Sequence, residues 1–218
     1  MTFIVKNTTF LNPLNLIAPH SCRGCGSLGE VLCECCKNNI IMSHGNFVPD
    51  LEEHGLPPIF VLNHRDTIIG DLVHDFKYNS TRAIGTKLAE ILDQTLPHFD
   101  GPINIVPLPT ISRHIRERGL DHTLFIAKRL ARLRGKNYQV ARILERMNNT
   151  VQVGADRETR LSQAESAYAL TNNAKIDSEN TYLLFDDVWT TGASMKAATK
   201  KLQQAGASKI VIVVLAQS

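Results

Sequence analysis

The segment from Tyr182 to Ala216 has the order strand, loop, helix, strand, and this order constrains the fold more than any other feature. Tyr182 to Phe185 is apolar and aromatic-rich, as expected for a short buried strand. After a loop of small residues, apolar side chains recur at helical spacing until Gly206, which favours a helix end. Ile210 to Ala216 is a β-branched run without alternation, typical of a strand buried on both faces of a parallel sheet.

Helical and strand patterns already alternate from about residue 66 onward. The expected elements are helices at 68–76, 84–92 and 120–134 and strands at 103–106 and 140–144. The alternation predicts an α/β fold, a parallel sheet flanked by helices with its ligand at the carboxyl ends of the strands. Residues 66–218 are assigned to this domain and residues 1–65 to a small N-terminal module, of which 37–65 is interpreted as connecting structure.

The loop from Thr190 to Ser194 joins the carboxyl end of a strand to the amino end of a helix. Free backbone N–H groups and the positive helix terminus can bind a phosphate there without a cationic side chain. The preceding Asp186 and Asp187 would repel a phosphate but can accept hydrogen bonds from hydroxyls, so a ribose 5-phosphate suits both parts. The predicted phosphate contacts are Thr190, Thr191, Gly192, Ala193 and Ser194. The alternative is an ordinary turn into a helix, with Asp and Thr-Thr-Gly as turn residues.

All five cysteines lie between residues 22 and 36. Two Cys-x-x-Cys pairs present four thiolates, a set that suits tetrahedral zinc in a closed, structural site. The predicted ligands are Cys22, Cys25, Cys33 and Cys36. Cys35 can replace Cys36 as a ligand, and a redox disulfide is the competing interpretation, although a thioredoxin-like motif would occur once rather than twice.

The segment from Thr110 to Lys136 holds eight basic and two acidic residues in a chain of net charge +3. One interpretation is a solvated helix face. The other is a surface for a polyanion such as DNA, with an affinity that falls steeply with salt. No apolar run approaches the roughly 18 residues of a membrane helix, and the N-terminus lacks the pattern of a secretory signal. We therefore expect a cytoplasmic protein without membrane insertion.

The string from Leu184 to Ser194 resembles the phosphoribosyl pyrophosphate (PRPP) binding motif of type I phosphoribosyltransferases. A second set of features spans nearly the whole chain and consists of the cysteine pairs, Asp75-Phe-Lys-Tyr78, Val106-Pro-Leu-Pro109, Arg116-x-Arg-Gly119, Gln152, Arg160 and the string itself. In this arrangement the chain is similar to the ComF family, associated in bacteria with DNA uptake in natural competence.

The resemblance implies a type I phosphoribosyltransferase-like domain with an N-terminal zinc ribbon. It implies transfer of a phosphoribosyl group from PRPP to an unknown acceptor, with magnesium on the departing pyrophosphate. Asp186 and Asp187 would be the catalytic pair that holds the ribose. Pro107 and Leu108 would lie in the loop around the pyrophosphate, with Arg116 and Arg118 clamping it.

The chain departs from the family at Arg118-Gly-Leu-Asp-His122, where Arg-Gly-Phe-Asn-Gln is usual, and at Gln163, where Asn is usual. A role that depends on the amide pair would therefore be altered. Three functional hypotheses follow: a magnesium-dependent phosphoribosyltransferase, a non-catalytic PRPP sensor that regulates DNA uptake, and a DNA-binding accessory whose sugar-phosphate site is vestigial. The macromolecular partner expected is single-stranded DNA or the DNA-uptake machinery.

Overall fold

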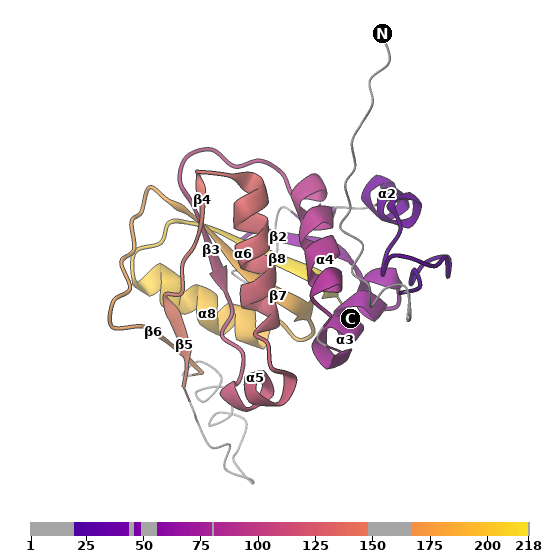
Figure 1. Cartoon of the computed structure of the whole chain (residues 1–218). Helices are drawn as coiled ribbons and strands as arrows, with labels where there is room; N and C mark the ends of the chain where they lie inside the picture. The colour runs from indigo at the N-terminus through magenta and orange to yellow at the C-terminus, as the bar shows by residue number, and fades with distance from the viewer. Residues whose placement is uncertain (1–19, 44–45, 49–55, 80, 148–166, 218) are drawn as a thin grey trace.

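A computed structural model describes residues 20–43, 46–48, 56–79, 81–147 and 167–217 (Figure 1). Its centre is a six-stranded sheet of order β1-β2-β8-β7-β3-β4, in which only the β1–β2 pair is antiparallel. The strands are β1 (Asn46–Val48), β2 (Ile59–His64), β3 (Ile103–Pro107), β4 (Tyr138–Val140), β7 (Thr181–Trp189) and β8 (Lys209–Gln217). The expected α/β fold with a mostly parallel sheet is confirmed.

Helices cover both faces of the sheet (Figure 1). The described helices are α2 (Glu34–Ser43), α3 (Ile68–Asn79), α4 (Arg82–Thr95), α5 (Ser112–Arg118), α6 (His122–Arg134) and α8 (Ala193–Gln204). Side chains alternate along β7, so Leu183 and Phe185 join the apolar core beneath α3, α4 and α6, whereas Tyr182 and Leu184 join the core beneath α8. The helical periodicities seen in the sequence therefore mark real buried faces.

The strand expected over residues 140–144 was wrong. β4 ends at Val140, and the chain leaves the main sheet after the Ala141 amide donates to the Ile105 carbonyl at 2.9 Å. It then forms β5 (Leu144–Arg146), which pairs antiparallel with β6 (Tyr168–Leu170). The run from Val140 to Leu144 thus ends one strand and begins another in a second sheet. Its apolar side chains Ile143 and Leu144 pack into the core beneath α8.

The interpretation of segment 37–65 as connecting structure was also wrong. The segment contains most of α2 and both β1 and β2, and β2 is an interior strand that pairs parallel with β8. A division after residue 65 would therefore separate β2 from its partner. The cysteine segment belongs to the same apolar core, because Cys22 and Leu32 cluster there with Leu72 and Phe76. Gln152, Arg160 and Gln163 lie outside the described residues.

Candidate functional site

Asp186 and Asp187 lie within β7 rather than in the turn beyond it, because the strand continues to Trp189. Successive strand residues point to opposite faces of a sheet. Asp187 accordingly faces α3, where its Oδ1 lies 2.8 Å from Lys77 Nζ with both side chains mostly buried. Asp186 Oδ1 accepts a hydrogen bond of 2.8 Å from the Asp187 amide. The charge of Asp187 acts on Asp186, but the two side chains have different partners.

Burial, and secondarily the charge of Asp187, raises the pKa of Asp186 from 3.8 to about 8. Lys77 and Arg146 act in the opposite direction but are outweighed. Asp186 is therefore mostly protonated at neutral pH in the free protein.

Asp186→Asn is expected to stabilise the protein strongly at pH 9 and to have little effect at pH 4. The folded-state pKa is raised, so the stability conferred by the protonated carboxyl is complete below about pH 4 and is lost as the pH rises through about 8. Asparagine removes this loss because it stays neutral. Melting temperatures across this pH range measure the effect, with Asp71→Asn on the exposed face of α3 as control. A gain that is equal at both pH values would contradict the titration.

The loop between β7 and α8 turns at Gly192, whose φ of 71° is left-handed. A side chain there would also collide with Trp189, because a Cβ would lie 2.4 Å from a carbon of the indole ring. Ala193 N donates to Thr191 Oγ1 at 3.4 Å, and α8 begins at Ala193. The predicted strand-to-helix loop is thus present, with Thr190, Thr191, Ala193 and Ser194 exposed.

Sequence reasoning missed Arg146, which stands on β5 beside this loop. Its Nη1 donates to Tyr168 Oη at 3.0 Å, and its guanidinium lies over the Tyr168 ring. The buried Tyr168 hydroxyl in turn hydrogen-bonds Ser194, at the start of α8. Arg146 is therefore a cation held near both Asp186 and the loop. No motif marked it, because its partners come from strands and a helix distant in sequence.

A cavity of about 710 Å³ opens beside the end of β3. The predicted Pro107 and Leu108 line it, together with Arg142, Arg146 and the polar residues Thr171 to Asn173. Among the described residues, Asp186, Asp187 and the 190–194 loop do not line it. Arg146 both lines this cavity and acts electrostatically on Asp186.

Arg116 and Arg118 do not line that cavity either. Arg116 is exposed on α5, whereas the Arg118 guanidinium lies 5.3 Å from the centre of the Tyr78 ring. Arg118 is therefore near the Lys77 and Asp187 pair, on the opposite side of the sheet from Arg146. Neither predicted clamp residue therefore lines the cavity that Pro107 and Leu108 line.

Asp121 and His122 stand where the resembled family has an amide pair, and here both side chains make contacts within the fold. Asp121 caps α6 by accepting a hydrogen bond of 3.1 Å from Leu124 N. His122 is buried, with its ring edge-on to Phe76 at 4.6 Å between centroids. Burial lowers the pKa of His122, against smaller opposing effects of the Phe76 backbone and Asp187. The imidazole is therefore neutral at physiological pH.

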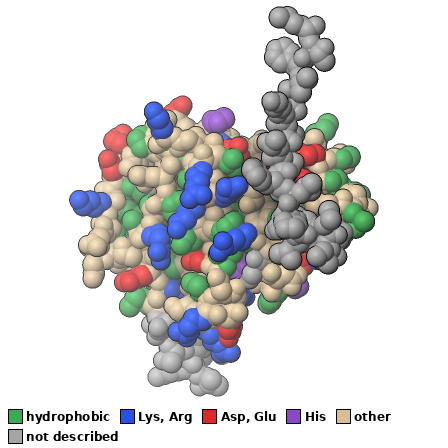
Figure 2. All heavy atoms as spheres, viewed as in Figure 1, with side chains coloured by type: hydrophobic (Ala, Val, Ile, Leu, Met, Phe, Trp, Pro, Cys, Tyr) green, Lys and Arg blue, Asp and Glu red, His purple; other side chains and the backbone are tan. Residues whose placement is uncertain are grey.

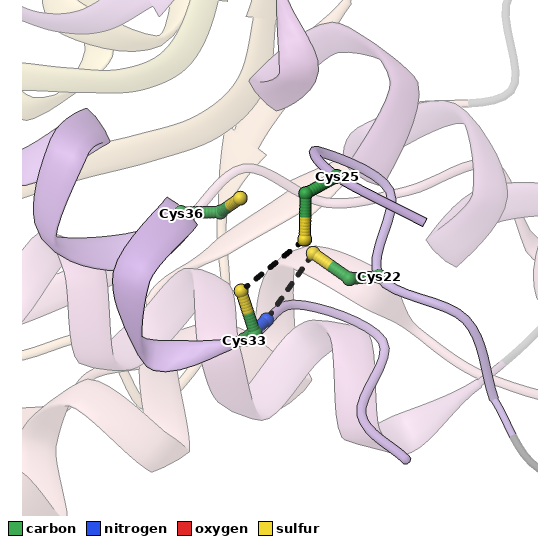
Figure 3. A group of neighbouring side chains, drawn as sticks. All are labelled: Cys22, Cys25, Cys33 and Cys36. Carbon is green, nitrogen blue, oxygen red and sulfur yellow. Dashed lines mark hydrogen bonds between the residues drawn. The ribbon is translucent and has the colours of Figure 1, made fainter. Parts of the chain in front are cut away.

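The four predicted cysteines converge at the N-terminal end of α2 (Figure 3). One sulfur from each of Cys22, Cys25, Cys33 and Cys36 lies within 4.8 Å of the others, and Cys35 is exposed outside the group. Gly24 permits this approach, since a Cβ there would lie 2.6 Å from Cys36 Sγ. The cluster resolves the choice between Cys35 and Cys36 in favour of Cys36.

The chemistry of the cluster fits a metal ion. Burial opposes ionisation of Cys22, but backbone N–H groups, including that of Cys33 at 3.3 Å, lower its pKa to about 6. The neighbouring thiols, Cys33 first, instead raise the pKa of Cys36 to about 12. The four sulfurs cannot all be thiolates without a compensating cation. Four cysteines at this spacing can bind a metal ion such as zinc.

A scan against protein-family models finds no match to this chain, and a search of curated proteins finds no relative. Within the part of the chain that the structure describes, no helix combines the length and apolarity needed to cross a membrane.

Proposed function

We propose that this protein is a cytoplasmic, PRPP-binding phosphoribosyltransferase-like member of the ComF family, with a type I phosphoribosyltransferase fold and a link to DNA uptake. One observation carries the proposal. Two adjacent carboxylates stand near the end of an interior parallel strand, and a glycine-turned loop leads from this strand into the positive end of α8. Such a strand end provides acceptors for sugar hydroxyls and amides for a phosphate.

The ribose 5-phosphate occupies the end of β7 in this proposal. Its phosphate binds the amides of the 190–194 loop, and Arg146 adds a positive charge beside Ser194. Its 2′ and 3′ hydroxyls donate to Asp187 and Asp186. Asp187 then shares its oxygens between Lys77 and the sugar. Its carboxylate stays compensated by Lys77 while it lends negative potential to the oxocarbenium-like centre that develops.

The diphosphate occupies the cavity beside Pro107 and Leu108. Arg142 and Arg146 line that cavity, so we assign them the role that the family resemblance implies for Arg116 and Arg118. Magnesium would be held by Asp186 or Asp187 together with PRPP oxygens, because it prefers oxygen ligands. It supplies neutralisation of the charge that grows on the departing pyrophosphate. The zinc at the cysteine cluster is structural.

Arg142→Gln tests the assignment of the diphosphate. We expect PRPP and inorganic pyrophosphate to bind about tenfold more weakly, and ribose 5-phosphate to bind unchanged, because a charge-assisted hydrogen bond to the diphosphate is removed. Titration calorimetry with magnesium present measures all three ligands. Arg132→Gln, on the exposed face of α6, is the matched control. Equal weakening of ribose 5-phosphate would overturn the assignment, and a wild-type protein that does not bind PRPP would overturn the proposed function.

A phosphoribosyltransferase and a PRPP sensor share this binding site. They differ in turnover, because only the enzyme releases pyrophosphate when PRPP and an acceptor are supplied together. Pyrophosphate assays with nucleobases, simple amines and water as acceptors therefore separate the two. The environment of Asp186 favours the enzyme, since a carboxyl that titrates near neutral pH can exchange a proton with an acceptor.

DNA binding is the second candidate function. Lys and Arg side chains gather on the face that carries α6 (Figure 2), where Lys128 and Arg132 are exposed. Not every basic residue of the 110–136 segment can contact DNA, however, because some are paired within the protein. Arg134 has a side chain only 1% exposed and pairs with Asp93 at 2.8 Å while donating to backbone carbonyls at the end of α4. Arg113 is paired with Glu117.

The double change Lys128→Gln and Arg132→Gln tests this candidate. If single-stranded DNA crosses α6, its affinity falls and the slope of log affinity against log salt decreases by about 1.4, that is about 0.7 for each phosphate that is no longer neutralised. Fluorescence anisotropy with a labelled oligonucleotide measures the slope. Lys175→Gln with Lys200→Gln removes the same charge elsewhere and serves as control. An unchanged slope would exclude this surface.

A further inference from the structure

We propose that Arg23 is a positioning residue that couples the cysteine cluster to the acidic end of β7 through helix α3. The inference rests on the proposed function and extends it. If the coupling exists, metal binding at the cysteine cluster affects PRPP binding at the end of β7, which explains why one chain carries both sites.

The first step of the connection lies inside the cysteine cluster. Arg23 follows Cys22 directly, and its guanidinium forms an ion pair with Asp75 of α3, whose side chain is 13% exposed. The same backbone loop passes close to α3 at a second point, because a Cβ added at Gly24 would lie 3.4 Å from Ile68 Cδ1. The geometry of the metal ligands therefore fixes where Arg23 stands relative to α3.

The second step runs along the last turn of α3. The other Asp75 oxygen, Oδ1, accepts a hydrogen bond of 3.3 Å from Asn79 Nδ2, at the final residue of the helix. The final turns of helices fray unless side chains hold them. Asp75 thus joins Arg23 on one side to the end of α3 on the other, and Lys77 lies between these two points.

The third step reaches the site. Lys77 Nζ lies 2.8 Å from Asp187 Oδ1, and the adjacent Tyr78 ring contacts the Arg118 guanidinium. If the last turn of α3 loosens, Asp187 loses the cation that compensates its charge beside Asp186. Arg23 touches neither the site nor the proposed substrate, so its influence passes entirely through Asp75 and Lys77.

A double-mutant cycle tests the coupling. Arg23→Met is expected to weaken PRPP binding about three- to tenfold while zinc remains bound, and Lys77→Met at least as much. The double variant should bind no more weakly than Lys77→Met alone, because Arg23 acts through Lys77. Arg23→Lys should restore most of the affinity. Asp71→Asn, which removes a charge from the exposed face of α3, is the control.

The same cycle can be measured without any ligand. Trp189 is the single tryptophan of the chain and packs on Gly192 in the loop after the acidic pair, so its fluorescence reports on the site. Lys77→Met and Arg23→Met should shift its emission in the same direction, without addition in the double variant. Additive effects, or an Arg23→Met protein with wild-type emission, would overturn the coupling. A wild type that fails to bind PRPP would overturn the proposed function but leave this fluorescence test intact.

Discussion

Replacing both Cys22 and Cys25 by serine is expected to abolish zinc binding and to lower the melting temperature of the protein substantially. The wild type should contain about one zinc per chain, because four sulfurs within 4.8 Å of one another can supply the four ligands that zinc takes. Cys22 is also 3% exposed and belongs to the core that includes Leu32 and Leu72. Loss of the metal therefore removes both a cross-link and the anchor of the N-terminal part of that core. Elemental analysis and thermal unfolding measure the two effects.

Cys35→Ser is the matched control for the zinc prediction. Cys35 lies in the same segment but is exposed and outside the sulfur cluster. The variant should keep the full zinc content and an unchanged melting temperature. Zinc missing from Cys35→Ser, or retained in the Cys22 and Cys25 double variant, would contradict the ligand set. A wild type that loses stability under reducing conditions but contains no zinc would instead favour a disulfide.

The parallel sheet could be predicted because β7 and β8 each contain an uninterrupted apolar run and the covering helices show a clear apolar repeat. β2 was missed because its short buried run follows Pro57 and Pro58, which are typical of a connector. Local apolar patterns indicate buried elements. They are least informative for a short strand whose flanking residues are typical of a loop.

The chemistry of the site was only half visible in the sequence. The acidic pair, the loop and the cysteines are contiguous motifs, so their spacing identified them. Lys77 and Arg146 became candidates only when the fold brought α3 and β5 to the two faces of β7. The reverse holds for Arg134, which belongs to the basic segment in the sequence but holds the end of α4 in the structure. Long-range pairing of charged residues has no local signature.

Asp187→Asn is expected to weaken PRPP binding roughly 30- to 100-fold at pH 7, equivalent to about 2–3 kcal/mol. In the proposed complex Asp187 supplies the charged acceptor for the ribose hydroxyls, and its change to a neutral amide also leaves Lys77 without this carboxylate partner. Calorimetry with PRPP and magnesium measures the loss. Inorganic phosphate, which lacks the hydroxyls of a sugar, should bind the variant as it binds the wild type.

Asp186→Asn provides the comparison that makes this prediction specific. Because the pKa of Asp186 is raised to about 8, its carboxyl is already mostly neutral at pH 7, so the change to asparagine costs much less affinity there than Asp187→Asn. At pH 9 the wild-type Asp186 is ionised, and the effects of the two variants should approach each other. Equal effects at pH 7 would contradict the different environments of the two acids. If Asp187→Asn binds PRPP as tightly as the wild type, the ribose does not bind at the end of β7. DNA binding would then be the better supported function.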